Sequence, residues 1–130
     1  MFTICYVSHA ENDVSKTDME KLFATTQKNN TACDITGILL FESGNFLQVL
    51  EGNDTTVLNL FEKIEQDSRH KNIFVILKQK CNRRIFENYS SGFSVVKSKE
   101  ELQKIETYLN QIEDSPNLKY IKGLLEPFLL

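Results

Sequence analysis

Short apolar runs of β-forming residues alternate with two segments of helical period, and this alternation limits the folds available to the chain more than any other feature. Five runs are predicted to form strands: residues 2–7, 34–41, 45–51, 73–77 and 93–96. The second and third runs are separated only by Glu42-Ser43-Gly44, which is typical of a hairpin turn. The sheet is therefore expected to be mainly antiparallel.

The two intervening segments have apolar residues at the spacing of one helix face. The first helix is predicted to begin after Ser15 or Thr17, and Thr17 also has the spacing of a capping box. It is predicted to end at Asn29-Asn30, because asparagine tolerates left-handed and turn conformations. The second helix follows the turn at residues 52–55. The apolar stripes are Met19, Leu22, Phe23 and Thr26 in the first helix, and Val57, Leu60, Phe61 and Ile64 in the second.

In chain order these elements read β-α-β-β-α-β-β, the split arrangement of ferredoxin-like α+β folds. The two helices are expected to cover one face of the sheet. Residues 98–130 are predicted to form further helices, with Ser98 at the first cap, that cover the other face. Their apolar end, residues 124–130, either docks on the sheet or meets another subunit. We therefore expect a domain over residues 1–97 and a helical extension over residues 98–130 packed on it.

Charge and cysteine content exclude several classes of protein. With 130 residues and a net charge of −3, the chain lacks the clustered cations of a broad nucleic-acid surface, so no direct DNA binding is expected. Cys5, Cys33 and Cys81 are widely spaced and odd in number, unlike a zinc motif or a disulfide framework. No stretch has the features of a signal peptide or a membrane helix. These features predict a cytoplasmic protein without a membrane anchor.

Two polar side chains are predicted to point into the core. Alternation along a strand places Gln48 on the same face as Phe46 and Leu50, and Tyr6 on the same face as Ile4. A buried amide without partners costs roughly 1–3 kcal/mol, so Gln48 needs a donor and an acceptor. The two side chains could satisfy each other, or they could satisfy the polar edge of a ligand. A tyrosine in an apolar strand is more often an ordinary core residue, so residue types alone leave both interpretations open.

Six segments together follow the order and spacing of a known family. They are Ile4-Cys5-Tyr6-Val7-Ser8, Gln27-Lys28-Asn29-Asn30, Ile35-Thr36-Gly37-Ile38-Leu39-Leu40-Phe41, Phe46-Leu47-Gln48-Val49-Leu50-Glu51-Gly52, Asp67-Ser68-Arg69-His70 and Phe86-Glu87-Asn88-Tyr89-Ser90-Ser91-Gly92-Phe93. The chain thereby resembles a BLUF domain, a sensor of blue light using flavin, from about residue 2 to residue 96. The segment around Gln48 is the most specific of the six.

The resemblance implies that a flavin lies between the two predicted helices, with Thr26 and Ile64 lining its pocket. It implies that Asn30 bonds a ring carbonyl and a ring NH, and that Asn29 lies against the ring edge. Lys63 stands where the family usually has an arginine on the pyrimidine side. The implied cofactor is FAD, with FMN or riboflavin left open.

Asp67 is expected to face the same way as Lys63, one helical turn later. Gln48 matches the family's switch glutamine, between the flavin and the tyrosine that matches Tyr6. The phenol of tyrosine, with a pKa near ~10, is neutral at pH 7, and an amide carries a donor and an acceptor on one plane. The implied function is a light-driven rearrangement of these hydrogen bonds, which makes the protein a sensor and not an enzyme. A separate downstream protein is expected to read the signal, and a homo-oligomer, dimer or larger, is expected.

Two departures from the family pattern affect these expectations. Lysine at position 63 keeps the charge of arginine and loses its bidentate fork, so flavin binding could be weaker. Tyr89-Ser90-Ser91 stands where many members have Trp-Ser-Met. Because Ser91 replaces that methionine, signal transmission through the last strand could differ.

Three other functions compete with the sensor. An acylphosphatase-like hydrolase needs an arginine in a glycine-rich loop after the first strand, and residues 7–11 contain neither. A flavin oxidoreductase needs a substrate cavity, for which a chain of this length has little room. A light-insensitive interaction module is the main alternative, although Tyr6, Asn30 and Gln48 argue against it. His9 and His70 do not suggest a metal site.

Overall fold

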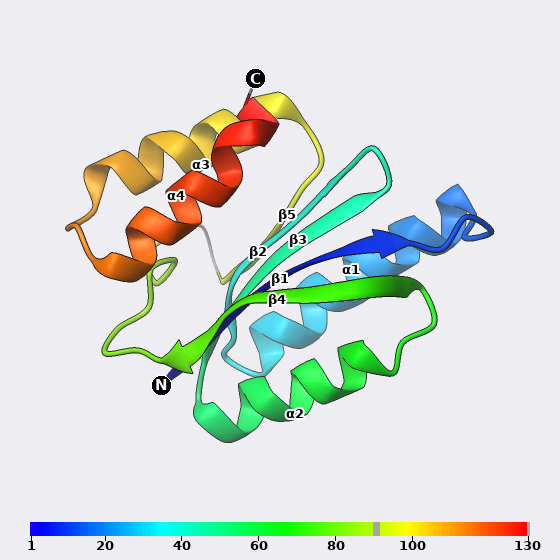
Figure 1. The fold of residues 1–130 in the computed structure, drawn as a ribbon, viewed down its shortest axis with the longest axis horizontal. Helices are drawn as coiled ribbons and strands as arrows, with labels where there is room; N and C mark the ends of the chain where they lie inside the picture. The colour runs from blue at the N-terminus through cyan, green and yellow to red at the C-terminus, as the bar shows by residue number, and fades with distance from the viewer. Residues whose placement is uncertain (90–91, 130) are drawn as a thin grey trace.

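The computed structural model describes residues 1–89 and 92–129 (Figure 1). Within these residues the strands are β1 (Phe2–Ala10), β2 (Thr36–Glu42), β3 (Asn45–Gly52), β4 (His70–Lys80) and β5 (Phe93–Val96). The helices are α1 (Lys16–Ala32), α2 (Asp54–Glu65), α3 (Lys99–Gln111) and α4 (Pro116–Leu129).

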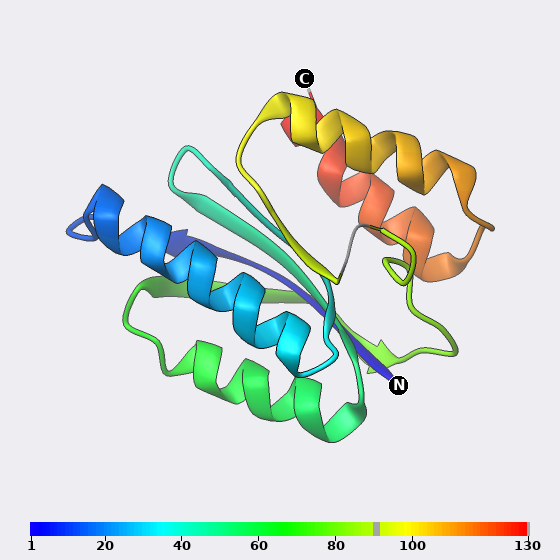
Figure 2. The same cartoon turned by 180° about the vertical axis from the view of Figure 1, so that it is seen from behind.

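The strands form one sheet in the order β4-β1-β3-β2-β5. Neighbouring strands are antiparallel except β2 and β5, which are parallel. Helices α1 and α2 lie on one side of the sheet and α3 and α4 on the other, as the opposite views in Figures 1 and 2 show. The predicted ferredoxin-like α+β fold is confirmed, with β5 added at one edge.

Alternation along the central strands divides the interior into two apolar cores. Tyr6, Phe46 and Leu50 belong to the core under α1 and α2, whereas Cys5 and Val49 belong to the core under α3 and α4. The buried apolar helix residues are Met19, Leu22, Phe23, Val57 and Phe61 in the first core, and Leu102, Ile105, Leu109, Leu118, Ile121 and Leu125 in the second. The apolar C-terminal helix therefore docks on the sheet, which is one of the two outcomes expected for it.

Short-range signals explain where several elements begin. Ser15 is the N-cap of α1, and its hydroxyl accepts a hydrogen bond from the Asp18 backbone N–H at 3.1 Å. Asn53 caps α2 in the same way. In the hairpin turn, Ser43 and Gly44 have φ of 52° and 81°. Two successive positive φ values are typical of the type I′ turn, whose twist matches that of the flanking strands.

The predicted end of the first helix is wrong. The helix α1 does not stop at Asn29-Asn30 but continues to Ala32, and Cys33 is its C-cap. The Cys33 N–H donates to the Asn29 carbonyl at 3.0 Å. Packing of the helix on the sheet outweighs the weak local preference of asparagine. As a consequence, Asn30 projects from a helix face toward the sheet and is buried.

Strands β1 and β4 are also longer than predicted. The first strand was expected to end at residue 7, yet residues 9 and 10 are paired with Lys71 and His70 of β4. In addition, the Ala10 N–H donates to the Gly44 carbonyl at 2.9 Å. Because β1 lies between β3 and β4, hydrogen bonds from both sides hold its polar end in the sheet, which the local sequence does not indicate.

Within the described part of the chain, no helix is both long enough and apolar enough to cross a lipid bilayer.

Candidate functional site

A cleft of about 260 Å³ opens between α1 and α2, with the central strands of the sheet as its floor. Every residue that the sequence suggested for cofactor binding contributes to its lining: Thr26, Asn29, Asn30, Gln48, Lys63, Ile64 and Asp67. Leu22 and Leu60 add apolar wall from the two helices. A concave site with apolar walls and few converging polar groups is the usual form of a small-molecule site.

Gln48 lines the cleft and forms a hydrogen bond with Tyr6, which is not itself part of the cleft lining. They lie directly opposite each other on the antiparallel strands β1 and β3. The Gln48 Nε2 atom donates to the Tyr6 hydroxyl oxygen. Tyr6 is fully buried and Gln48 almost so, with 2% of its surface exposed. Of the two interpretations that the sequence left open, this contact shows that the side chains bond each other.

The bond between Tyr6 and Gln48 nevertheless leaves one hydrogen-bonding atom of the Gln48 amide without a partner among the described residues. The Gln48 Oε1 atom is buried and has no hydrogen-bond partner among the described residues, and the same is true of the Asn30 Nδ2 atom. Buried polar atoms without partners are rare in native proteins, and each one calls for an explanation. Here one unused acceptor and one unused donor line the same cleft. This combination fits a ligand whose polar edge carries both a carbonyl and an N–H group.

Burial also controls the protonation of the tyrosine. It raises the pKa of Tyr6 well above its ordinary value, against the smaller opposing effect of the bond from Gln48. The Tyr6 ring also contacts Phe61 and His70, with ring centroids 5.5 Å and 6.2 Å away. The phenol is therefore neutral throughout the physiological range and held in one orientation.

Comparison with known protein families identifies the group to which this arrangement belongs. The family described as BLUF, sensors of blue-light using FAD, matches residues 1–92. This match covers more than half of the chain. The chain belongs to the BLUF family.

BLUF proteins are flavin-dependent sensors of blue light, and the relatives found by sequence are photoactivated regulators. The chain is 32% identical over 102 residues to the photoactivated adenylate cyclase subunit alpha of Euglena gracilis, which covers 78% of the chain and 10% of that protein. It is 37% identical over 75 residues to the blue light- and temperature-regulated antirepressor BluF of Escherichia coli K12, covering 58% of the chain and 19% of the antirepressor. The chain thus spans only a small part of the curated relatives it matches.

Solved BLUF structures share the whole fold. The BLUF domain of BlrP1 superposes with a TM-score of 0.77 at 26% identity, covering 98% of this chain and 88% of that one. BlsA in its photo-activated state superposes with a TM-score of 0.69 at 26% identity, covering 95% and 93%. In both cases the similarity extends through α3 and α4, beyond the part that resembles the family by sequence.

A flavin fits the BLUF cleft of this chain in chemical terms. The pyrimidine side of a flavin carries carbonyl and N–H groups on one planar edge, which complements the unused Asn30 donor and Gln48 acceptor. Thr26 and Ile64 are half-buried on the facing helices, whereas Asn29 and Lys63 are exposed at the mouth. Asn30 and Gln48 are thus the deep polar contacts of this cleft, and Asn29 and Lys63 are outer ones.

Asp67 occupies a different local structure from the one expected. The helix α2 ends at Glu65, so Asp67 does not lie one helical turn beyond Lys63 but in the turn that follows the helix. Its carboxylate accepts two hydrogen bonds from the Arg69 guanidinium, at 3.0 Å from Nε and 2.6 Å from Nη2. These bonds lower the pKa of Asp67. The carboxylate therefore remains charged at the edge of the cleft.

The sequence analysis did not predict several other lining residues, among them Arg69 and His70. His70 is part-buried, and its Nδ1 lies 3.0 Å from the Ser8 hydroxyl. Burial lowers the pKa of His70. Both residues belong to the Asp67-Ser68-Arg69-His70 segment of the BLUF pattern, which could have indicated that they lie near the site. Ser91, which stands where many members have methionine, lies outside the described residues together with Ser90.

Proposed function

We propose that this chain holds a flavin non-covalently in the α1–α2 cleft and senses blue light through Tyr6 and Gln48. The observation that carries this proposal is that Asn30 and Gln48, which each have one buried amide atom without a partner among the described residues, line the same cleft, and that Gln48 is also bonded to the buried Tyr6. Asn30 would hold the polar edge of the ring through Nδ2. Thr26 and Ile64 would enclose the ring between the helices, and the outer contacts Asn29, Lys63 and Asp67 would border it.

When bound, the flavin supplies absorption of blue light and an excited state that is a strong oxidant. Tyr6 would be suited to respond because its hydroxyl oxygen accepts a hydrogen bond from the Gln48 amide, so a change in the charge of the phenol changes what Gln48 bonds. Gln48 presents Nε2 to Tyr6 and the unused Oε1 to its surroundings. Rotation of the amide, or a change of its tautomer, replaces that acceptor with a donor. The ligand edge then meets a different hydrogen-bonding group.

The energies involved require a lit state that decays. One rearranged hydrogen bond contributes roughly 0.5–1.5 kcal/mol net. Shifting a two-state equilibrium from 1:99 to 99:1 takes about 5.5 kcal/mol. The rearrangement alone does not hold the lit state, so light populates it and thermal motion returns it. We expect reversion in the dark.

An absorption spectrum of the purified protein before and after blue light tests this function. We expect a yellow protein with a modest red shift that reverses in the dark. Tyr6→Phe and Gln48→Ala are each expected to keep the colour and to abolish the shift, whereas the exposed Tyr120→Phe should keep both. Lasting bleaching would indicate redox chemistry instead. A protein that stays colourless after addition of flavin would be a light-insensitive module.

We propose FAD as the cofactor, in line with the description of the family, and FMN and riboflavin are the competing flavins. Extraction of the bound flavin from protein expressed in cells, followed by chromatography against the three standards, identifies it. FMN or riboflavin as the main species would reject FAD.

We propose that the chain is not an enzyme and passes its signal to a separate protein in the cytoplasm, as part of a homo-oligomer. Free cysteines at positions 5, 33 and 81, one of them exposed, suit a reducing compartment. Phe74 and Val75 on β4 are exposed apolar surface that a partner or a second copy could cover. Light scattering after size exclusion, in the dark and in the light, measures the subunit number. A monomer in both states would reject the oligomer.

We further propose that residues 1–97 form the flavin-binding unit and that residues 98–130 are an extension folded onto it. The shared core supports this arrangement, since α3 and α4 bury Cys5, Ile38 and Val49 of the sheet. We expect one cooperative unfolding transition for the whole chain, observed by both flavin release and circular dichroism. Two separate transitions would reject the shared core.

A further inference from the structure

Three residues after Gln48, the same strand carries a buried carboxylate on Glu51. Its side chain is completely inaccessible to solvent. Burial raises the pKa of Glu51, and hydrogen bonds from its neighbours partly oppose that rise. A buried carboxylate persists only where donors surround it. The identity of those donors shows which parts of the molecule it joins.

The Glu51 carboxylate accepts hydrogen bonds from β2 and from the loop that follows β4. Its Oε1 accepts from the Thr36 hydroxyl at 2.8 Å and from the Phe86 backbone N–H at 2.6 Å. Its Oε2 accepts from the Ile85 backbone N–H at 2.8 Å. Two adjacent backbone donors of the loop therefore terminate on one side chain of β3. An amide could not replace this carboxylate, because its NH₂ group would face one of the donors.

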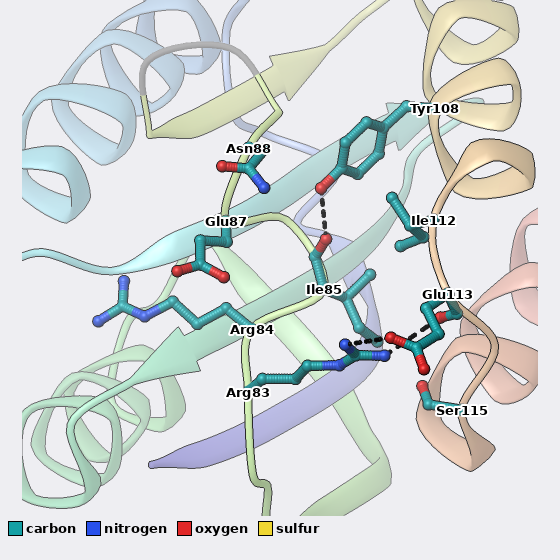
Figure 3. A pocket seen from close by; sticks show the side chains of 9 residues that line it. All are labelled: Arg83, Arg84, Ile85, Glu87, Asn88, Tyr108, Ile112, Glu113 and Ser115. Atoms are coloured by element: carbon teal, nitrogen blue, oxygen red, sulfur yellow. Dashed lines mark hydrogen bonds and ion pairs between the residues drawn. The ribbon is translucent and has the colours of Figure 1, made fainter.

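The same loop residues also contact α3, and Figure 3 shows this for Ile85 and Tyr108. The Tyr108 hydroxyl donates to the Ile85 carbonyl at 2.6 Å. The Tyr108 ring stacks on Phe86, with ring centroids 6.3 Å apart and planes inclined by 23°. Ile85 and Phe86 thus bond β3 through their N–H groups. They contact α3 through the Ile85 carbonyl and the Phe86 ring.

A second contact holds the loop near the end of α3. The Arg83 Nη1 lies 2.9 Å from Glu113 Oε2, just beyond the last turn of that helix, and this pair also appears in Figure 3. Both side chains are more than half exposed, so the ion pair contributes little stability. The buried Glu51 therefore connects the loop to β3 and the Tyr108 hydroxyl connects it to α3, while Arg84 of the same loop separately bonds Asp34.

We infer that Glu51 is a positioning residue that fixes the Ile85–Phe86 loop on the photoactive strand, and that Tyr108 passes a change at Gln48 from this loop to α3. This inference rests on the proposed function, because it assigns a route to the signal that Tyr6 and Gln48 generate. Any shift of β3 at Gln48 moves Glu51 with it, since the two residues share a strand with continuous pairing on both sides. The loop follows through the two hydrogen bonds that the Ile85 and Phe86 N–H groups donate to Glu51.

Hydrogen exchange in the full chain with flavin bound, in the dark and under blue light, tests the route. The variant Tyr108→Phe keeps the stacked ring and removes the hydrogen bonds of the hydroxyl group with the loop, at the Ile85 carbonyl and at the Asn88 backbone. The matched control is Tyr120→Phe, the same change at an exposed position of α4. Glu51→Gln is a second variant, which disturbs the β3 end of the route. Each protein is also checked for the red shift of its absorption.

We expect light to change the exchange of α3 amides in the wild-type chain and in Tyr120→Phe. In Tyr108→Phe that light-dependent change should fall by roughly two- to tenfold, the equivalent of one hydrogen bond, while the red shift keeps its full amplitude. A full light response of α3 in Tyr108→Phe would overturn the route. So would a wild-type chain that shifts its absorption without any response of α3. Absence of the red shift in the wild-type chain would instead reject the proposed function, and the route with it.

Discussion

Buried polar groups on the two faces of the central strand β3 differ in whether they have hydrogen-bond partners. On the face toward α1 and α2, Gln48 and Asn30 each leave one buried atom without a partner among the described residues. On the other face, the Glu51 carboxylate is surrounded by three donors from two separate segments. Both arrangements place polar atoms where water does not reach. The first is open to a ligand, whereas the second is complete and joins parts of the fold.

This difference shows why burial of a polar residue does not by itself indicate function. A carboxylate with all its hydrogen-bond partners stabilises the loop it bonds. Its removal lowers the free energy of unfolding, because the buried donors then lack an acceptor. An unsatisfied amide lowers the stability of the ligand-free protein, and only a bound molecule recovers that cost. The two classes of site should therefore respond to substitution with opposite signs.

The largest effect is expected at Glu51. Replacement by alanine leaves the buried N–H groups of Ile85 and Phe86 without an acceptor, so we expect a loss of roughly 2–5 kcal/mol in unfolding free energy. Urea unfolding followed by circular dichroism measures this loss. Glu62→Ala, at an exposed position of α2, is the control and should change stability by less than about 0.5 kcal/mol. Equal losses of stability at the two positions would contradict the view that Glu51 holds the Ile85–Phe86 loop on β3.

A smaller effect of opposite sign is expected at Asn30. Asn30→Leu removes the unpartnered Nδ2 and should stabilise the ligand-free chain by about 1 kcal/mol. The same change removes a proposed donor to the flavin, so affinity should fall about tenfold. Titration of the ligand-free protein with flavin, beside urea unfolding, measures both quantities. Asn59→Leu, at an exposed position of α2 outside the cleft lining, serves as the control, and a loss of stability without a loss of affinity at Asn30 would count against its role.

The smallest effect concerns pH and His70. Because burial lowers the pKa of His70 in the folded protein, the unfolded chain binds a proton first as pH falls through about 6.5. Stability is therefore full above that pH and declines below it, by at most about 1.4 kcal/mol per pH unit for one proton. His70→Gln should flatten the decline between pH 6.5 and 5, measured by unfolding at several pH values. A His9→Gln variant, changed at an exposed position, should retain the decline.

Sequence reasoning was most successful where short-range patterns carry the information. Period-two alternation correctly placed Tyr6 and Gln48 on one inward face, and Phe93–Val96 formed a strand as expected. The predictions failed where neighbours in space decide the outcome. Asn29-Asn30 has the composition of a helix end, yet helix packing carries α1 through it. No role was predicted for Glu51, because nothing in its local sequence indicates that the backbone N–H of a residue 34 positions later donates to its carboxylate.

The order of strands and helices, their amphipathic faces and the residue types of the sensor follow from the sequence alone, since each depends on residues within a few positions of one another. Tertiary structure alone decides which polar atoms are satisfied. Hydrogen-bond partners of a buried group come from segments that are distant in the chain, and only their final packing leaves Gln48 and Asn30 with unused atoms and Glu51 with none. This difference in hydrogen bonding distinguishes the ligand cleft from the buried contact between Glu51 and the loop.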